Sequence, residues 1–233
     1  MDKNEHAQKV NALFTSIATR YDLINDIQSL GLHRLWKQRI VNMSGFVESQ
    51  KALDICCGTG DLVMRLACLG GRVVGLDKNN SMLDIGNNRI IKINNINADL
   101  FQADALSLPF SDSSFNLITI AYGLRNLSDY QAGLQEALRV LKPEGRLLIL
   151  DFGKPHNFFI RKLYYTYLKF ILPVFGLFLC GNPFAYSYIL TSLKKYPAQN
   201  GISSMLRQVG FKNIQVTNIL LGTMSVHKAE KPL

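Results

Sequence analysis

The sequence predicts an α/β fold in which a mostly parallel sheet is covered by helices on both faces. Short apolar segments alternate with segments of helical periodicity between residues 51 and 151, and this alternation is typical of parallel strands joined by crossover helices. Two further strand-like segments, 211–217 and 222–228, lie near the C-terminus. We expect them to form a hairpin that completes a seven-stranded sheet with an antiparallel edge. At 233 residues and 48% apolar content, residues 1–233 are sufficient for a single domain.

The N-terminal residues 1–45 are predicted to form a helical cap on this domain. Apolar side chains from Val10 to Tyr21 recur at i, i+3, i+4 and i+7, which indicates an amphipathic helix over 4–21. A polar and aromatic cluster follows at 21–36 and contains His33 and Trp36. Both aromatic anchoring of the core and coverage of a ligand are consistent with this cluster.

The core elements follow in order. The predicted strands are 51–56, 72–76, 96–101, 115–121 and 145–151, and the predicted helices are 61–69, 80–92 and 130–141. A later helix at 200–209 is expected to end at Gly210, since glycine is common immediately after a helix. In sheets of this kind, ligands bind at the carboxyl ends of the parallel strands.

A glycine turn after the first strand marks the expected ligand site. Gly58 and Gly60 separate the first strand from the first core helix, and glycines there let backbone approach a ligand closely. Asp77 closes the next strand, nineteen positions after Gly58, where a carboxylate can accept from both hydroxyls of a ribose. Asp104 follows the third strand and is placed to accept from an adenine amino group. Each aspartate alone is typical of a turn or a helix cap, but together they predict a nucleoside-containing cofactor.

The turn favours S-adenosylmethionine over NAD as that cofactor. A dinucleotide-binding fingerprint has a third small residue where this chain has Val63, so the fingerprint is incomplete. Asp61 would repel a pyrophosphate but is compatible with the cationic ammonium and sulfonium groups of S-adenosylmethionine.

Cysteine usage and the N-terminus predict a cytosolic protein without a metal centre. The four cysteines are Cys56, Cys57, Cys68 and Cys180. They show neither Cys-x-x-Cys spacing nor neighbouring histidines, so we expect reduced thiols and no bound metal. The first residues lack the apolar segment of a signal peptide, and we do not expect export.

The net charge of +9 is concentrated in the C-terminal third. Residues 151–233 contain ten Lys or Arg but only two Asp or Glu, and no acidic residue lies between Asp151 and Glu230. Such a surplus suits anionic lipid headgroups or nucleic acid, and a solvated basic surface is equally consistent with the charge alone.

Four motifs along the core resemble those of class I methyltransferases, which have a Rossmann-like fold. They are Leu53-Asp54-x-x-x-Gly58-Thr59-Gly60-Asp61, Leu76-Asp77, Ala103-Asp104-Ala105-Leu106-x-Leu108-Pro109-Phe110 and Arg139-Val140-Leu141-Lys142-Pro143-x-Gly145. Three more resemble the ubiquinone/menaquinone biosynthesis C-methyltransferases in particular: Tyr21-Asp22-x-x-Asn25, Ser29-Leu30-Gly31-Leu32-His33-x-x-Trp36 and Gly123-Leu124-Arg125-Asn126. The resemblance runs from about residue 14 to residue 227.

This resemblance implies methyl transfer from S-adenosylmethionine to a ring carbon of a polyprenyl quinol. The implied cofactor-binding residues are Asp54, Gly58, Thr59, Gly60, Asp77, Asp104, Ala105 and Ala121; Ala121 stands where the family often has serine. Demethylmenaquinol is the leading substrate, and the ubiquinone-pathway benzoquinol stays open. The alternatives are methylation of another lipid, a small molecule or RNA, and binding of S-adenosylmethionine without catalysis.

The chemistry of a quinol agrees with catalytic roles near Arg125. A quinol carbon becomes nucleophilic when a phenolic hydroxyl is deprotonated, and Arg125 is expected to stabilise the resulting anion while Asn126 orients the hydroxyl or a water. Because arginine is a poor base, the proton acceptor is expected to be water, Tyr21, Asp22 or His33.

The segment 152–197 is predicted to be an aromatic and basic lid-like insertion. Its uncharged run 170–193 is interrupted by two prolines and two glycines, and the dense apolar part 170–180 is too short to span a bilayer. We expect it to admit a polyprenyl chain and to contact an anionic membrane surface peripherally, at the inner face. An additional helical layer is the alternative. Nucleic acid is not an expected partner, because aliphatic side chains dominate the segment; a homodimer stays open.

Overall fold

The computed structural model describes residues 3–93, 96–171, 173 and 184–233. Within these ranges, seven strands form one sheet in the order β3-β2-β1-β4-β5-β7-β6. The strands are β1 Lys51–Ile55, β2 Arg72–Asp77, β3 Ala98–Gln102, β4 Phe115–Ala121, β5 Leu141–Phe152, β6 Lys212–Ile219 and β7 Met224–Glu230. The first five are parallel, and β7 runs antiparallel to both β5 and β6. The predicted α/β fold with an antiparallel C-terminal edge is therefore confirmed.

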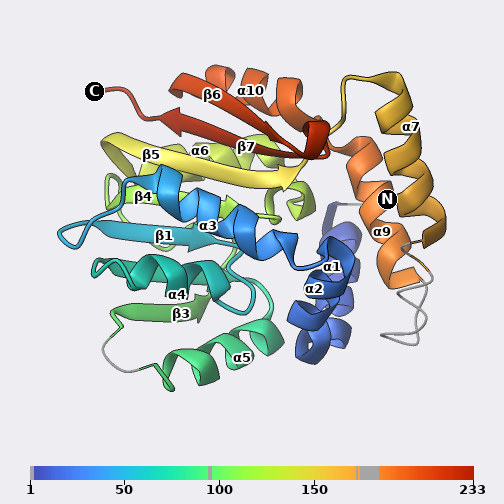
Figure 1. Ribbon diagram of the computed structural model, residues 1–233. Helices are drawn as coiled ribbons and strands as arrows, with labels where there is room; N and C mark the ends of the chain where they lie inside the picture. Colours follow the sequence, from blue (N-terminus) through green and yellow to red (C-terminus); the bar gives the residue numbers. More distant parts are fainter. Residues whose placement is uncertain (1–2, 94–95, 172, 174–183) are drawn as a thin grey trace.

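Helices cover both faces of this sheet (Figure 1). In chain order they are α1 Lys3–Ile17, α2 Tyr21–Ser29, α3 Leu32–Ser44, α4 Asp61–Ala67, α5 Asn80–Ile90, α6 Tyr130–Val140, α7 Phe158–Thr166, the π-helical turn η3 Tyr167–Ile171, α9 Phe184–Lys195 and α10 Ala198–Val209. Leu134 of α6 and Ile202 of α10 belong to one buried cluster, whereas Ile40 of α3 and Leu66 of α4 belong to the other. Each sheet face thus has its own apolar core, as expected for a doubly covered sheet.

The N-terminal helix differs from the prediction of one helix over 4–21. It ends at Ile17, a 3-10 turn Ala18–Arg20 (η1) follows, and Tyr21 begins α2. The hydroxyl of Thr15 donates to the Asn11 carbonyl, and such bonds from Ser or Thr to the preceding turn bend helices. The break lets Tyr21 begin a helix in a new direction, which the apolar period alone did not indicate.

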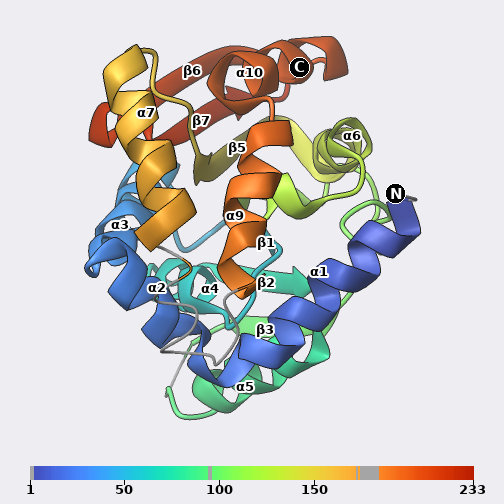
Figure 2. The same cartoon turned by 90° about the vertical axis from the view of Figure 1, so that its right-hand side faces the viewer.

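The carboxyl ends of the parallel strands meet the helices α1, α2, α7 and α9 at one end of the molecule (Figures 1 and 2). Within the segment 152–197, the helices α7, η3 and α9 are described, while the part of the apolar run at 172 and 174–183, including Cys180, lies outside the described residues. In the described part of the chain, no helix combines the length and the apolar character needed to cross a bilayer.

Candidate active site

The glycine turn is held against the end of β2 by backbone bonds. Gly58 and Gly60 have φ angles of 56° and 76°, in the left-handed region that favours glycine. The Gly58 amide donates to Asp77 Oδ2 over 2.9 Å. A Cβ placed on Gly60 would lie 3.1 Å from Leu100 Cδ1, so this turn accepts little beyond glycine.

A first cavity, which we call the glycine-turn cavity, lies over this turn. Its lining includes five of the predicted cofactor-binding residues, namely Gly58, Asp77, Asp104, Ala105 and Ala121. Val10, Asn11, Phe14 and Tyr21 close it from the N-terminal side. The glycine at position 58 leaves room above the turn, because a Cβ there would meet only Tyr21 Cε1, 3.9 Å away.

The remaining predicted cofactor residues lie beside the cavity and support it. Asp54 is buried and accepts from the Thr119 hydroxyl over 2.5 Å, and burial raises its pKa to about 7. The Thr59 hydroxyl donates to Asp22, which also pairs with Arg89. Gly60 precedes the first residue of α4.

The two aspartates at the strand ends differ in their partners. Asp77 accepts from the amides of Gly58 and Asn79, and burial raises its pKa even though these bonds oppose the shift. Asp104 accepts from Lys78 Nζ over 2.8 Å and from the Leu106 amide over 2.9 Å. A carboxylate has about four acceptor positions, so both side chains keep capacity for a ligand. The carboxylates, the glycine turn and the small Ala105 and Ala121 side chains together suit S-adenosylmethionine.

Asp61 does not line this cavity, although its negative charge was one of the reasons for predicting S-adenosylmethionine as the cofactor. It pairs with Lys37 over 2.9 Å and with Arg65 over 3.0 Å. Burial opposes ionisation of Asp61, but the two cations outweigh it and lower the pKa of the carboxyl. The choice of S-adenosylmethionine therefore depends on Asp77, Asp104 and the turn, and not on contact with Asp61.

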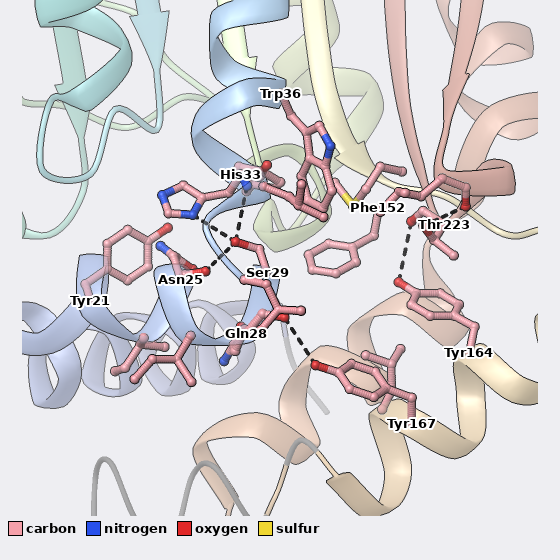
Figure 3. Close-up of a pocket in the computed structure, with 18 of the residues that line it drawn as sticks. Tyr21, Asn25, Gln28, Ser29, His33, Trp36, Phe152, Tyr164, Tyr167 and Thr223 are labelled. Atoms are coloured by element: carbon pink, nitrogen blue, oxygen red, sulfur yellow. Dashed lines mark hydrogen bonds between the residues drawn. The ribbon is translucent and has the colours of Figure 1, made fainter.

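A second cavity of about 560 Å³, which we call the large cavity, lies between the N-terminal helices and the segment after β5 (Figure 3). This size falls in the usual range for small-molecule sites. Apolar and aromatic side chains dominate its lining, among them Leu13, Phe14, Ile17, Ile24, Trp36, Phe152, Leu168, Ile171 and Leu220. Tyr21, Asn25 and His33 come from α2 and α3, whereas Tyr164 and Tyr167 come from α7 and η3.

The polar groups on the helical walls are bonded within the protein. His33 Nδ1 lies 3.0 Å from Ser29 Oγ, and the Ser29 hydroxyl donates to the Asn25 carbonyl (Figure 3). Burial is the main cause that lowers the pKa of His33, so the ring is neutral near pH 7. Because the Ser29 hydroxyl donates to the Asn25 carbonyl, we assign Nδ1 as the donor in this pair and the lone pair to Nε2.

Arg125 lies on the wall of the large cavity and forms a buried ion pair. Its Nη1 donates to Asp151 Oδ1 over 2.8 Å and to the Tyr122 carbonyl over 2.7 Å. Its guanidinium lies 4.5 Å from the centre of the Phe152 ring. Asp151, at the end of β5, is only 1% exposed. This aspartate was not among the predicted site residues, although an acid at the end of a parallel strand was the signal that could have found it.

Three residues, Phe14, Tyr21 and Tyr122, line both cavities and therefore separate them. Of the predicted catalytic residues, Tyr21, His33 and Arg125 line the large cavity, while Asn126 lines the glycine-turn cavity. Asp22 lines neither. The chain thus places the glycine-turn cavity, with its carboxylates, beside the largely apolar large cavity, and a short aromatic partition lies between them.

Comparisons with known proteins agree with this arrangement. The model of the ubiE/COQ5 methyltransferase family matches residues 2–231. A ubiquinone/menaquinone biosynthesis C-methyltransferase UbiE of Cellvibrio japonicus is 43% identical over 98% of this chain and 93% of its own length. The UbiE of Pseudomonas fluorescens strain Pf0-1 is 39% identical over 99% of this chain and 91% of its own length.

Solved structures share the fold at low sequence identity. An S-adenosylmethionine-dependent methyltransferase from Aquifex aeolicus has a TM-score of 0.62 and 17% identity, over 84% of this chain and 89% of its own. Phosphoethanolamine N-methyltransferase 2 of Haemonchus contortus, in complex with S-adenosyl-L-methionine, has a TM-score of 0.64 and 18% identity, over 85% of this chain and 52% of its own. The full-length family match, the Rossmann-like sheet and the glycine turn lead to one conclusion. The chain belongs to the ubiE/COQ5 methyltransferase family and is an S-adenosylmethionine-dependent C-methyltransferase of quinone biosynthesis.

Proposed function

We propose that this enzyme methylates a ring carbon of a polyprenyl quinol, with demethylmenaquinol as the leading substrate and the ubiquinone-pathway benzoquinol as the second. The observation that carries the proposal is the adjacency of the two cavities across Phe14, Tyr21 and Tyr122. A quinol ring in the large cavity would lie against this partition, next to the cofactor. The apolar lining suits the ring and the first part of a prenyl chain, because both would lose contact with water there.

Residues around the partition account for the chemistry. Bound S-adenosylmethionine would supply an electrophilic methyl group, and the electron pair of the methyl–sulfur bond would stay on sulfur. The quinol loses one hydroxyl proton, its neighbouring ring carbon forms the new carbon–carbon bond, and loss of that carbon's hydrogen as a proton restores the aromatic ring. Arg125 on the cavity wall stabilises the anionic ring, and the large cavity excludes water around it.

We assign the first proton transfer to His33. Its Nε2 has a free lone pair, the ring is neutral, and Asp26 Oδ1 lies 3.7 Å from Nε2, where it favours the protonated imidazole. Tyr21 would order the hydroxyl beside it. Asp22 has another task, because its bonds to Thr59 and Arg89 tie α2 to the glycine turn.

We further propose that the mouth of the large cavity faces an anionic membrane surface, peripherally and from the cytoplasmic side. Leu30, Ile171 and Leu220 line the cavity and are also 87%, 47% and 50% exposed, so they mark its mouth. With the neighbouring Leu221, 75% exposed, we call them the mouth patch. Basic side chains at 161, 162 and 169 lie on the adjoining α7 and η3, and this combination of apolar and basic groups suits a lipid interface.

The assignment is tested by supplying purified enzyme and labelled S-adenosylmethionine with demethylmenaquinol, a demethylated ubiquinol precursor or RNA. We expect label in at least one quinol and none in RNA, and the ratio of the two quinol rates decides which ring is preferred. Label found only in RNA, or in no acceptor despite measurable cofactor binding, would contradict the proposal.

A further inference from the structure

Tyr122 has a strained backbone conformation, and hydrogen bonds from neighbouring site residues hold it. Its φ angle is 62°, which is an outlier for a bulky residue and which persists only where surrounding contacts enforce it. The Tyr122 amide donates to the Leu150 carbonyl over 2.7 Å. Its carbonyl accepts from Arg125 Nη1 over 2.7 Å and from Asn126 Nδ2 over 3.4 Å. Both members of the Arg-Asn pair therefore converge on this one residue.

The side chain of Tyr122 is placed where the two ligands would meet. It lines both cavities, and its hydroxyl is buried without a hydrogen-bond partner among the described residues. Two other tyrosines of the large cavity are different. Tyr164 and Tyr167 donate to the carbonyls of Thr223 and Gln28 (Figure 3). Because a buried hydroxyl without a partner is unfavourable, Tyr122 is the one of these three tyrosines whose hydroxyl would gain from a hydrogen bond to a ligand.

The protonation state fits a donor. Burial is the main cause that raises the pKa of Tyr122 far above its usual range, with Tyr21, Asp151 and Asp61 acting in the same direction and Arg125 opposing them. The hydroxyl therefore keeps its proton at neutral pH and acts as a hydrogen-bond donor, not as a base.

We propose that the Tyr122 hydroxyl donates a hydrogen bond to the quinol oxygen next to the ring carbon that receives the methyl group, and so stabilises the anion that forms there. This role rests on the proposed function. The reacting carbon must lie at the partition to meet the methyl group, and the neighbouring oxygen must lie there with it. Since Arg125 also pairs with Asp151, a second donor at the partition would add to the stabilisation of the negative oxygen.

The kinetic test compares Tyr122→Phe with two matched controls, Tyr164→Phe and Tyr167→Phe, each of which removes one hydroxyl from the same cavity. With a short-chain demethylmenaquinol, we expect kcat of Tyr122→Phe to fall roughly 10- to 100-fold, the range for a hydrogen bond to a charged group. KM should change little, because the bond strengthens as the anion forms. The pH at which kcat reaches half its maximum should rise. Each control should lower kcat by clearly less than Tyr122→Phe does, because the hydroxyls of Tyr164 and Tyr167 are bonded to carbonyls of the protein.

A binding experiment reads the same hydrogen bond without turnover. The probe is 1-naphthol, whose ionisation is visible by absorbance, bound to the full chain without cofactor. The pKa of bound 1-naphthol should be lower on the wild type than on Tyr122→Phe. The difference should be about one pH unit for each tenfold fall in kcat caused by the substitution. The thermal midpoint of Tyr122→Phe should not fall, since the change removes an unpaired buried hydroxyl.

The outcomes separate this inference from the proposed function. If the wild type methylates a quinol while Tyr122→Phe matches it in kcat and in the naphthol titration, the role of Tyr122 is overturned. A loss no larger than that of the two control variants also overturns it. If the wild type methylates no quinol at all, the proposed function fails, and the naphthol titration still reports whether Tyr122 stabilises a phenolate.

Discussion

The two cavities are built by different means. Strand ends and a backbone turn form the glycine-turn cavity, and the register of β1 against β2 fixes the position of Asp77 relative to Gly58. The large cavity instead depends on segments far apart in the chain, from Leu13 of α1 to Met224 at the start of β7. Sheet hydrogen bonds thus determine the glycine-turn cavity, whereas side-chain packing between helices determines the large cavity. We therefore expect substitutions in these helices to change binding of the acceptor more than binding of S-adenosylmethionine.

The largest expected effect comes from the buried ion pair between Arg125, on the wall of the large cavity, and Asp151. Arg125→Ala leaves Asp151 buried and without this cation, which should lower the free energy of unfolding by about 3–5 kcal/mol and abolish methyl transfer. Urea unfolding and the labelled-methyl assay measure the two effects. The control is Arg72→Ala, which breaks an exposed pair with Asp99 and should cost below about 1 kcal/mol. Equal destabilisation by both variants would show that the buried pair contributes no more to stability than the exposed pair does.

The next effect tests the sheet beneath the glycine turn. Asp54 has a pKa of about 7 in the folded chain, above the value of about 4 for an unfolded aspartate. The folded state therefore binds more protons between these values, and the Asp54 contribution to stability is lost as pH rises from about 4 to about 7. In the wild type, this loss should lower the free energy of unfolding by on the order of a few kcal/mol between about pH 5 and about pH 8. Asp54→Asn should remove that decrease, and urea unfolding at the two pH values measures it. The exposed Asp99→Asn is the control, and an unchanged slope in Asp54→Asn would contradict the burial argument.

A smaller effect concerns the glycine-turn cavity itself. Asp77→Asn keeps the shape of the side chain but removes the charge that would accept from a ribose, so affinity for S-adenosylmethionine should fall roughly 10- to 100-fold. Calorimetry measures the affinity, and circular dichroism checks that the turn still folds. Affinity for a quinol analogue should be unchanged, because Asp77 does not line the large cavity. A parallel loss of both ligands would mean that the cavities are not independent.

The smallest effect tests the mouth patch of the large cavity. Leu30→Asp combined with Leu221→Asp adds repulsion from an anionic surface and removes apolar contact, so co-sedimentation with anionic vesicles should fall several-fold. Turnover of a short-chain quinol in detergent should stay near that of the wild type. Ile91→Asp is the control, because Ile91 is 78% exposed at the C-terminal end of α5 and outside the patch. If the control loses as much co-sedimentation as the double variant, the mouth patch has no specific role in membrane binding.

Much of the fold could be predicted because its signals are local. Strand and helix positions between 51 and 151 agree with the structure to within a few residues at most ends. The larger miss there is β5, which begins at Leu141 instead of 145, because Leu141 pairs with Phe115 before an irregularity in register. The helix predicted over 4–21 ends at Ile17 instead. The apolar period continues past Ile17 although the helix changes direction there, so the period alone could not predict the break.

The sequence by itself determined the glycine turn, the acids at the strand ends and the family, because each depends on residue type at a fixed spacing along the chain. Tertiary structure decided the rest. Only packing shows that Asp61 turns to Lys37, that Asp22 ties α2 to Thr59, and that Arg125 is paired with Asp151. Only packing also places Tyr122 in the lining of both cavities and leaves its hydroxyl buried without a partner among the described residues. The physical reason is that side-chain partners far apart in sequence are chosen by burial and charge in three dimensions, which no spacing along the chain specifies.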